Sequence, residues 1–248
     1  MRRKYREQEY TDMQIEYLLR LTPQQFKHEI YSNYYADWIS KNPRTERFHN
    51  FMHSGIEKDL ENCYFPNTLE IGAGDLRHFH FVRHKFDKYV STDLYDPANQ
   101  LEDWRVADQR IKFIRDDITD TRLPVNSMDR IIVTCVLHHV SDVESALLGM
   151  RSVCKEKGSI DILLPHDPGL MFRLAKSVGP YRDAKKLNYI KIKKLMDVRD
   201  HVNHYPGILE LINFTFRNDY IKIRKYPFRF LGYDMNLWSH IRIKKCAN

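Results

Sequence analysis

Short apolar runs alternate with longer polar or amphipathic stretches through the middle of the chain. Five of these runs lie between residues 67 and 165, and two more lie near the C-terminus. Strands that alternate with helices form a mostly parallel sheet with helices on both faces, so the pattern predicts an α/β fold. The expected strands are TLEIG (68–72), KYVSTD (88–93), IKFIRDD (111–117), DRIIVTCV (129–136), SIDILLP (159–165), DYIKIRKYPF (219–228) and NLWSHIRIKK (236–245).

Helical periodicity predicts elements before and between these strands. Before the first strand we expect three helices, of which the second begins with Pro23 behind a Thr22 cap. Between the fourth and fifth strands we expect a helix that begins at a Ser141 cap and ends at Gly158.

The order of these elements divides the chain into four parts. We expect an N-terminal helical cap (1–62), a ligand-binding core (63–165), a helical basic insert on the acceptor side (166–218) and the last two strands of the core sheet (219–248). A chain of 248 residues, 42% of them hydrophobic, is long enough for one large domain with such an insert.

The bulk composition predicts an intracellular protein. No apolar run approaches the roughly 18 residues that a membrane span needs, and the basic N-terminus lacks the apolar stretch of a secretory signal. The four cysteines are scattered without a CxxC pair, which argues against both a disulfide framework and structural zinc. We therefore expect a reducing cytoplasm.

The positive charge is concentrated in one segment. The chain carries a net charge of +7, and residues 173–199 hold nine Lys/Arg against two acids, a local excess of the same size. Such a segment is either a solvated helix face or a surface that attracts an anion. The anion would be a phosphorylated substrate, nucleic acid or an acidic lipid headgroup.

Two closely spaced glycines follow the first strand, and acids end the next two strands. Gly72 and Gly74 allow the backbone to approach a ligand, and Asp93 comes about 20 residues later, where a carboxylate can accept hydrogen bonds from ribose. Asp116 and Asp117 end the third strand on the same edge of the sheet. Because a third glycine is absent, the turn suits a nucleoside better than a diphosphate.

Four segments resemble the successive motifs of class I S-adenosylmethionine-dependent methyltransferases. They are LEIGAGDL (69–76), STDLYD (91–96), IRDDITDTRLPVNSMDRIIVTCVLHHV (114–140) and LLGMRSVCKEKGSIDILLP (147–165). The resemblance covers about residues 67–165 and implies a Rossmann-like seven-stranded sheet with S-adenosyl-L-methionine as cofactor. The residues that it implies for the cofactor site are Glu70, Gly72, Ala73, Gly74, Asp93, Leu94, Asp116, Asp117, Ile118 and Thr134.

Within that resemblance each part of the cofactor has its own residues. Glu70 and the glycines would shape the pocket for the methionine part, and Asp93 would bind the ribose. Asp117 and the backbone of Ile118 would contact adenine, while residues 134–139 would form the floor beneath the sulfonium. The family often has a third glycine where this chain has Leu76.

Histidines near the ends of the fourth and fifth strands are the candidate bases. A hydroxyl or amine acceptor must lose a proton, and histidine suits this role near neutral pH. His166, beside Asp167, is the most specific candidate, and His138 and His139 are two others.

The insert supplies the candidate acceptor contacts. His201 and His204 would form a wall of the acceptor site, and Arg173 and Arg182 would contact an anionic group. As metal ligands, His201 and His204 have only i, i+3 spacing and no third ligand nearby, so we expect no metal site.

The preferred function is methylation of a small-molecule or glycan acceptor, with a hydroxyl favoured over an amine and a phosphate or carboxylate on the acceptor. Segments such as LPHDPGLMFRLAK resemble bacterial methyltransferases of cell-surface polysaccharide or secondary-metabolite gene clusters. The alternatives are an RNA methyltransferase, which the pI near 9.1 favours, and a non-catalytic subunit that only binds a partner. Peripheral contact with lipid headgroups is a further alternative.

Overall fold

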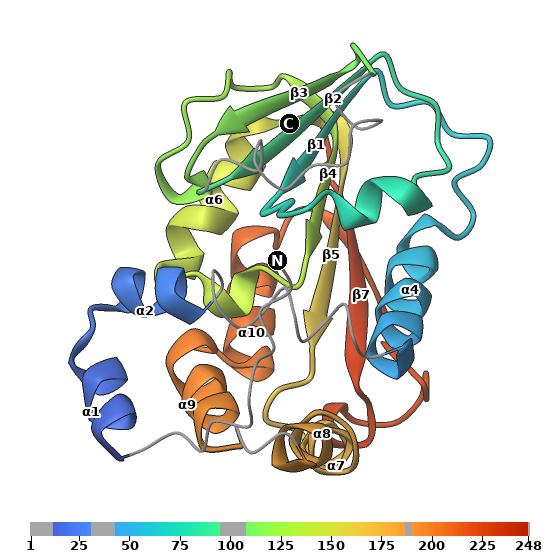
Figure 1. Cartoon of the computed structure of the whole chain (residues 1–248). Coiled ribbons are helices and arrows are strands. Elements are labelled where there is room, and N and C mark those ends of the chain that lie inside the picture. The colour runs from blue at the N-terminus through green and yellow to red at the C-terminus, as the bar shows by residue number, and fades with distance from the viewer. Residues whose placement is uncertain (1–11, 31–42, 95–107, 187–189, 248) are drawn as a thin grey trace.

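A seven-stranded sheet forms the centre of the computed structural model, which describes residues 12–30, 43–94, 108–186 and 190–247 (Figure 1). The strands are β1 (Asn67–Ile71), β2 (Lys88–Asp93), β3 (Ile111–Arg115), β4 (Met128–Thr134), β5 (Cys154–Pro165), β6 (Tyr220–Tyr226) and β7 (Trp238–Lys244). Their order is β3-β2-β1-β4-β5-β7-β6. The strands from β3 to β5 are parallel, and β7 runs antiparallel to β5 and β6. The predicted α/β sheet of seven mostly parallel strands is confirmed.

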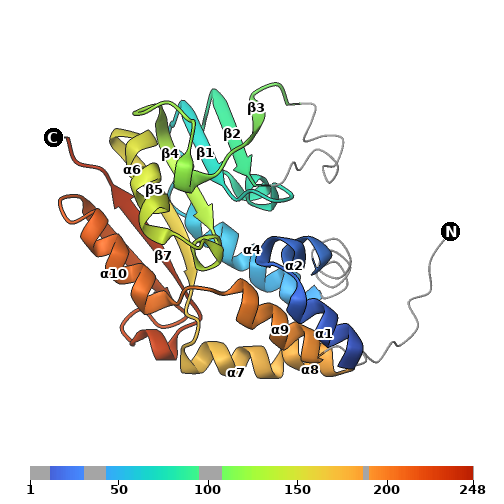
Figure 2. The same cartoon turned by 90° about the vertical axis from the view of Figure 1, so that its left-hand side faces the viewer.

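Helices cover both faces of this sheet. The helices α6 (Val143–Val153) and α10 (Tyr205–Thr215) lie on one face, and α4 (Pro43–Glu57) lies on the other (Figures 1 and 2). The start of α6 differs from the prediction, because the Asp142 carboxylate, and not Ser141, accepts from the Ser145 backbone N–H at 2.9 Å. The helix also ends at Val153, and Gly158 lies inside β5.

The first two helices pack on the insert. These are α1 (Asp12–Arg20) and α2 (Pro23–Ile30), and α2 begins as predicted with Thr22 as its cap. The insert contributes α7 (Leu170–Val178), α8 (Pro180–Lys186) and α9 (Ile190–Asp200). Leu18 and Phe26 form a small core with Ile192 and Met196 of α9. The expected N-terminal cap therefore divides: α1 and α2 lie against the insert, whereas α4 lies against the sheet. Residues 1–11 and 31–42 of that cap lie outside the described residues.

The two faces of the sheet differ in chemistry: one is apolar, and the other combines apolar side chains with buried polar and charged ones. Because side chains alternate along a strand, each strand contributes one set to each face. The face toward α6 and α10 is apolar and carries Leu69, Ile71, Ile131, Val133, Ile160, Ile162, Ile241 and Ile243. The face toward α4 includes buried polar or charged side chains from the same strands: Thr68, Glu70, Arg130, Asp161 and His240.

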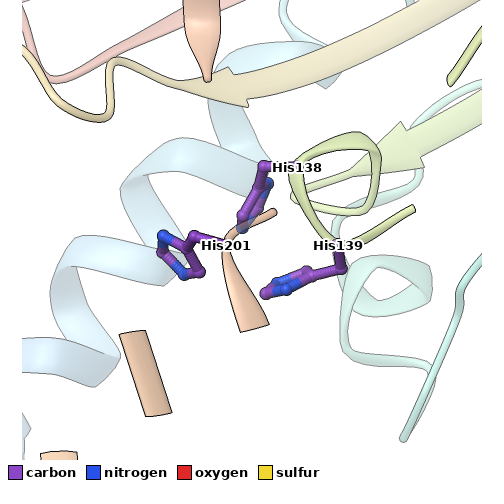
Figure 3. Close-up of side chains that lie close together, drawn as sticks. All are labelled: His138, His139 and His201. Carbon is purple, nitrogen blue, oxygen red and sulfur yellow. The ribbon is translucent and has the colours of Figure 1, made fainter. Parts of the chain in front are cut away.

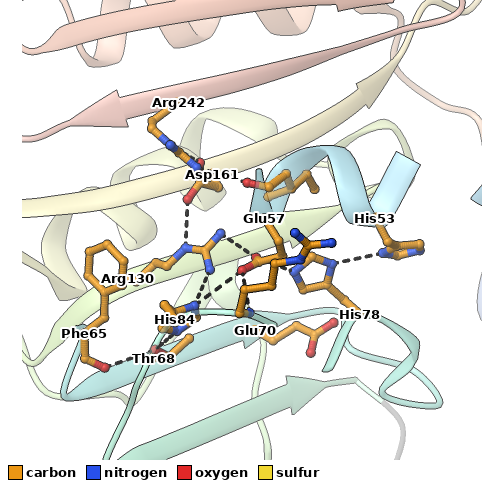
Figure 4. Close-up of polar contacts among 12 residues, drawn as sticks. His53, Glu57, Phe65, Thr68, Glu70, His78, His84, Arg130, Asp161 and Arg242 are labelled. Atoms are coloured by element: carbon orange, nitrogen blue, oxygen red, sulfur yellow. Dashed lines mark hydrogen bonds and ion pairs between the residues drawn. The ribbon is translucent and has the colours of Figure 1, made fainter. Parts of the chain in front are cut away.

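Arg130 is the centre of this polar face. Its side chain is completely buried on β4, between Asp161 of β5 and Glu57 of α4 (Figure 4). Nε donates to Asp161 Oδ2 at 2.8 Å, and Nη2 lies 2.7 Å from Glu57 Oε1. Nη1 donates to Nδ1 of His84, in the loop before β2, at 2.7 Å. One guanidinium thus joins two strands, a helix and a loop.

Further side chains satisfy the two carboxylates. His78 Nε2 donates to Glu57 Oε1 at 3.0 Å, while His240 and Arg242 of β7 donate to Asp161 Oδ1 at 2.8 and 2.6 Å. Burial alone would raise the pKa of Glu57, but the hydrogen bond from His78 and the charge of Arg130 hold that pKa well below its ordinary value. The carboxylate is therefore ionised in the folded protein.

In the described ranges, none of the helices combines the length and apolar character needed to cross a membrane.

Replacing Glu57 by Gln tests the contribution of this network to stability. Loss of the carboxylate leaves the buried guanidinium partly uncompensated, which should lower the free energy of unfolding by about 3–5 kcal/mol. Denaturant unfolding followed by circular dichroism measures the change. The matched control is Glu61→Gln, because Glu61 pairs with Arg83 at the surface and its loss should cost less than about 1 kcal/mol. Equal effects of the two substitutions would contradict the assignment.

Candidate active site

The glycine loop after β1 packs against the turn that follows β4. Gly72 has a φ of +63°, and a Cβ there would lie only 2.5 Å from Cγ2 of Val136. Gly74 has a φ of +50°, and a Cβ there would meet nothing within 4 Å. Gly72 is therefore required for close packing within the protein, whereas Gly74 lines open space where a ligand can approach the backbone.

Asp93 holds the glycine loop in place from the end of β2. Its Oδ2 accepts from the Gly74 backbone N–H at 2.9 Å, and the Ala73 N–H donates to the Thr92 carbonyl at 3.1 Å. Leu94, the next residue, is half exposed. The glycine loop and Asp93 thus lie together at one edge of the sheet, as predicted, and the ribose contact of Asp93 stays a prediction.

Glu70 lies beneath the loop rather than at its surface. The carboxyl group is buried and accepts from the Tyr89 hydroxyl at 2.6 Å, and burial raises the pKa of Glu70 to about 7. Its contribution to a ligand site is consequently through the shape of the loop.

The glycine turn is followed by a short 3₁₀-helix, η2 (Arg77–Phe81), and not by an α-helix. Leu76 precedes it in the left-handed conformation with a φ of 58°, and its side chain is fully buried. A left-handed residue interrupts α-helical geometry, so the chain cannot continue from the turn into a regular helix.

The two acids after β3 take different positions. Asp116 builds the following turn, accepting from Thr121 Oγ1 at 2.5 Å and from the Arg122 N–H at 3.1 Å. Asp117 is exposed and caps the 3₁₀-helix η4 (Ile118–Asp120) through Thr119. The engagement of both Asp116 oxygens in the turn argues against a direct cofactor contact, and Asp117 is the better-placed acid.

Ile118 is fixed by α6. A Cβ on Gly149 of α6 would lie 2.2 Å from the Ile118 carbonyl oxygen, so the close approach of η4 to α6 requires glycine at position 149. The Ile118 side chain is buried in the main core.

The turn after β4 joins the glycine loop to the insert. It begins after Thr134, which is half-buried, and contains the 3₁₀-helix η5 (Leu137–His139). The backbone N–H groups of Val202 and Asn203 both donate to the His138 carbonyl, at 3.0 and 3.2 Å. Since Val136 of the same turn contacts Gly72, this short segment touches both sides of the predicted crevice.

His138, His139 and His201 converge at this junction (Figure 3). His138 is buried, and the other two are partly exposed. His139 Nδ1 donates to the Asp200 carbonyl at 3.0 Å, and His201 Nδ1 donates to Asp167 Oδ2 at 2.6 Å. His138 and His139 were predicted as candidate bases and His201 as an acceptor contact, but the fold brings all three together.

Asp167 lies at the candidate site beside His201, although its sequence position indicated only a neighbour of His166. Burial alone would raise the pKa of its carboxyl group, but the hydrogen bond from His201 and the charge of Lys176 hold that pKa below its ordinary value. Its backbone carbonyl also accepts from the Tyr205 N–H at 3.0 Å, which fixes the start of α10. The signal was an acid two residues after the end of β5, at the same edge of the sheet as Asp93.

His166 has a different environment from the one predicted for a base. The residue is completely buried, with Nδ1 donating to the Tyr233 carbonyl at 2.8 Å and Nε2 accepting from Ser239 Oγ at 2.7 Å. Burial lowers the pKa of His166 to about 4. Both ring nitrogens are therefore occupied inside the protein, and this geometry opposes the expected catalytic role.

The remaining acceptor candidates do not join the histidine cluster. His204 is exposed at the start of α10, and Arg173 is exposed on α7. Arg182 lines a hollow of about 420 Å³ in the insert. The other lining residues are Ser177, Val178, Tyr181, Lys185, Ile190 and Lys194.

Part of the basic segment is used inside the fold. Lys176 and Lys193 pair with Asp197, and Arg199 donates to the carbonyls of Leu18 and Leu21 at 2.6 and 2.7 Å. The local excess of positive charge therefore overstates the charge available to an external anion.

Comparison with known proteins assigns the fold and the core. Residues 69–162 match the family model described as a methyltransferase domain, and no curated protein sequence gives a significant match. The structure is similar to a putative S-adenosyl-L-methionine-dependent methyltransferase from Methanococcus maripaludis, with 17% identity, coverage of 86% of this chain and 91% of that one, and a TM-score of 0.57.

Two further solved structures share the fold. One is a possible histamine N-methyltransferase from Thermotoga maritima, with 14% identity, coverage of 88% and 99%, and a TM-score of 0.57. The other is the N-methyltransferase NodS from Bradyrhizobium japonicum in complex with S-adenosyl-L-homocysteine, with 14% identity, coverage of 84% and 90%, and a TM-score of 0.52.

The residues at the glycine loop fit the cofactor of this family. Gly74 leaves space that a side chain would fill, and Asp93 lies beside it at the edge of the sheet where nucleosides bind. Together with the match of residues 69–162 to a methyltransferase domain and the strand order, these features support a class I S-adenosylmethionine-dependent methyltransferase, an enzyme with S-adenosyl-L-methionine as its cofactor.

Proposed function

We propose that this enzyme methylates a hydroxyl group of an anionic small molecule or glycan. The observation that carries the proposal is the turn after β4, which contacts the glycine loop through Val136 and the insert through His138. An acceptor bound against the insert would then face the cofactor across this turn.

The cofactor-binding roles follow from the positions of the loops. Gly74 and Asp93 would hold the methionine part and the ribose, and Asp117 with the Ile118 backbone would hold the adenine. The bound cofactor supplies a methyl group on a sulfonium, which is already activated for transfer. The main task of the protein is alignment, which can contribute on the order of 7–11 kcal/mol.

The histidine cluster would promote loss of the proton from the acceptor hydroxyl. His139 and His201 each donate through Nδ1, so in the neutral ring Nε2 carries a lone pair. These lone pairs can take a proton directly, with Asp167 stabilising the charged ring of His201, or they can bind a cation that acidifies the acceptor.

The hollow in the insert supports an acceptor with a phosphate or carboxylate. Three of its lining residues, Arg182, Lys185 and Lys194, are cationic, and no acid occurs among the lining residues that the structure describes. A surface lined by one sign of charge raises the local concentration of the opposite charge.

Two considerations place an amine acceptor second and RNA third. N-methyltransferases are among the similar structures, which keeps the amine as an alternative. RNA is favoured only by the basic charge, and several cations of the insert, including Lys176 and Arg199, pair inside the protein.

We also propose a cytoplasmic location, based on the four free cysteines. A role in polysaccharide or secondary-metabolite synthesis is proposed from the sequence resemblance.

A panel of matched acceptors tests the substrate class. Purified enzyme is incubated with methyl-labelled cofactor and pairs of sugars or phenols that differ only in a phosphate or carboxylate, with bulk RNA as a separate arm. We expect label in the anionic member of a pair, because the insert attracts negative charge. Transfer confined to RNA, or to the neutral members, would overturn the proposed acceptor class.

Asp93→Ala tests the ribose contact. Removal of the carboxylate should weaken binding of S-adenosyl-L-homocysteine by at least about tenfold, since it removes a charged hydrogen bond and the anchor of Gly74. Isothermal titration calorimetry measures the affinity. Asp108→Ala is the matched control. Asp108 also pairs with a neighbouring group, Arg110, but it lies just before the N-terminal end of β3, whereas the predicted cofactor site lies at the C-terminal ends of the strands. If Asp93→Ala binds like the unmodified enzyme, the ribose contact is misassigned.

A further inference from the structure

We infer that His138, His139 and His201 form a binding site for a divalent first-row transition cation, for which Zn²⁺ is the best match. Each ring offers a nitrogen, and the three nitrogens all lie within 4.8 Å of one another (Figure 3). From the sequence no metal site was expected, because His201 and His204 lacked a third ligand. The fold leaves His204 outside the group and supplies His138 and His139 from the turn after β4 instead.

The outer contacts of two rings match those of metal-bound histidines. Such a histidine almost always donates its second N–H to a carboxylate or a backbone carbonyl, which fixes the tautomer and orients the ring. His201 donates from Nδ1 to Asp167 at 2.6 Å, and His139 donates from Nδ1 to the Asp200 carbonyl at 3.0 Å. Nε2 is thereby left as the ligand atom on both rings.

The spacing requires only a small closure of the cluster. Zn–N bonds of about 2.0–2.1 Å in a tetrahedral site put ligand nitrogens about 3.3 Å apart, so no pair would have to close by more than roughly 1.5 Å. Rotation of the partly exposed His139 and His201 rings can supply this movement. The backbone around them is held by the Val202 and Asn203 N–H groups, which donate to the His138 carbonyl.

The charge balance of the surroundings also suits a cation. Three neutral imidazoles bring no charge, whereas Asp167 and Asp200 lie directly behind the rings. Lys176 opposes this effect in part, but its Nζ is shared between Asp167 and Asp197, at 3.4 Å from each.

Three histidine ligands leave the fourth position of a tetrahedral site open for an oxygen ligand. This is the arrangement of catalytic zinc sites, in which the open position holds water or substrate. A hydroxyl bound there loses its proton more easily: the O–H bond breaks, the proton passes to solvent, and the oxygen keeps the electron pair. This role rests on the proposed function, since the acceptor hydroxyl would occupy the open position, but binding of the cation does not depend on it.

Zinc and cobalt titrations test the site. The purified enzyme is treated with chelator, desalted, and titrated with Zn²⁺ by calorimetry and with Co²⁺ by visible absorption. We expect each chain to bind one metal ion tightly and the Co²⁺ form to show the intense absorption of four-coordinate Co²⁺. His139→Ala and His201→Ala should each weaken binding at least about thirtyfold, and Asp167→Asn should weaken it about 10–100-fold because it removes only the outer contact.

His204→Ala is the matched control, because His204 is exposed three residues from His201 and lies outside the cluster. The affinity of this variant for Zn²⁺ and Co²⁺ should equal that of the unmodified enzyme. Every variant is also titrated with S-adenosyl-L-homocysteine, which reports an intact cofactor site. Normal binding of that compound without a tight equivalent of Zn²⁺ or Co²⁺ would overturn the metal site and leave the methyltransferase function standing. Equal losses in His204→Ala and His201→Ala would likewise overturn it.

Discussion

The buried guanidinium of Arg130 is the constraint on which the arrangement around the sheet depends. Its contacts with Glu57, Asp161 and His84 connect α4, two strands and the loop before β2. Burial of such charges is expensive, and a well-packed apolar cluster of the same volume is often equally stable. The specific gain is orientation, because an apolar helix can slide on an apolar face, whereas α4 can satisfy Arg130 in only one register.

The sequence predicted the parts of the fold that depend on local pattern. Runs of alternating or continuous apolar residues located all seven strands, and Gly72, Gly74 and Asp93 were expected at one edge of the sheet and lie together there. The start of α6 was misassigned because Ser141 and Asp142 are both good caps, and only the geometry decides between them. The left-handed conformation of Leu76 could not be predicted from the sequence either, because leucine favours helices.

The candidate site was less predictable because its side chains come from distant segments. His201 lies more than 60 residues from His138, and no local signal indicates that the insert returns to the turn after β4. His166 illustrates the opposite difficulty: its position after a strand is typical of catalytic residues, but Tyr233 and Ser239, which occupy its nitrogens, come from the last part of the chain. Tertiary contacts of this kind decide whether a histidine has a catalytic or a structural role.

The packing of α1 and α2 against α9 has a consequence for the diversification of such enzymes. Arg199 reaches the carbonyls of Leu18 and Leu21, so two regions separated by most of the chain form a single body. Grafting only the insert from a homologue would remove Arg199 from the Leu18 and Leu21 carbonyls and leave the side chains of Leu18 and Phe26 without their partners on α9. Chimeras that retain solubility must therefore exchange both regions at once, and natural variation should show them changing in concert.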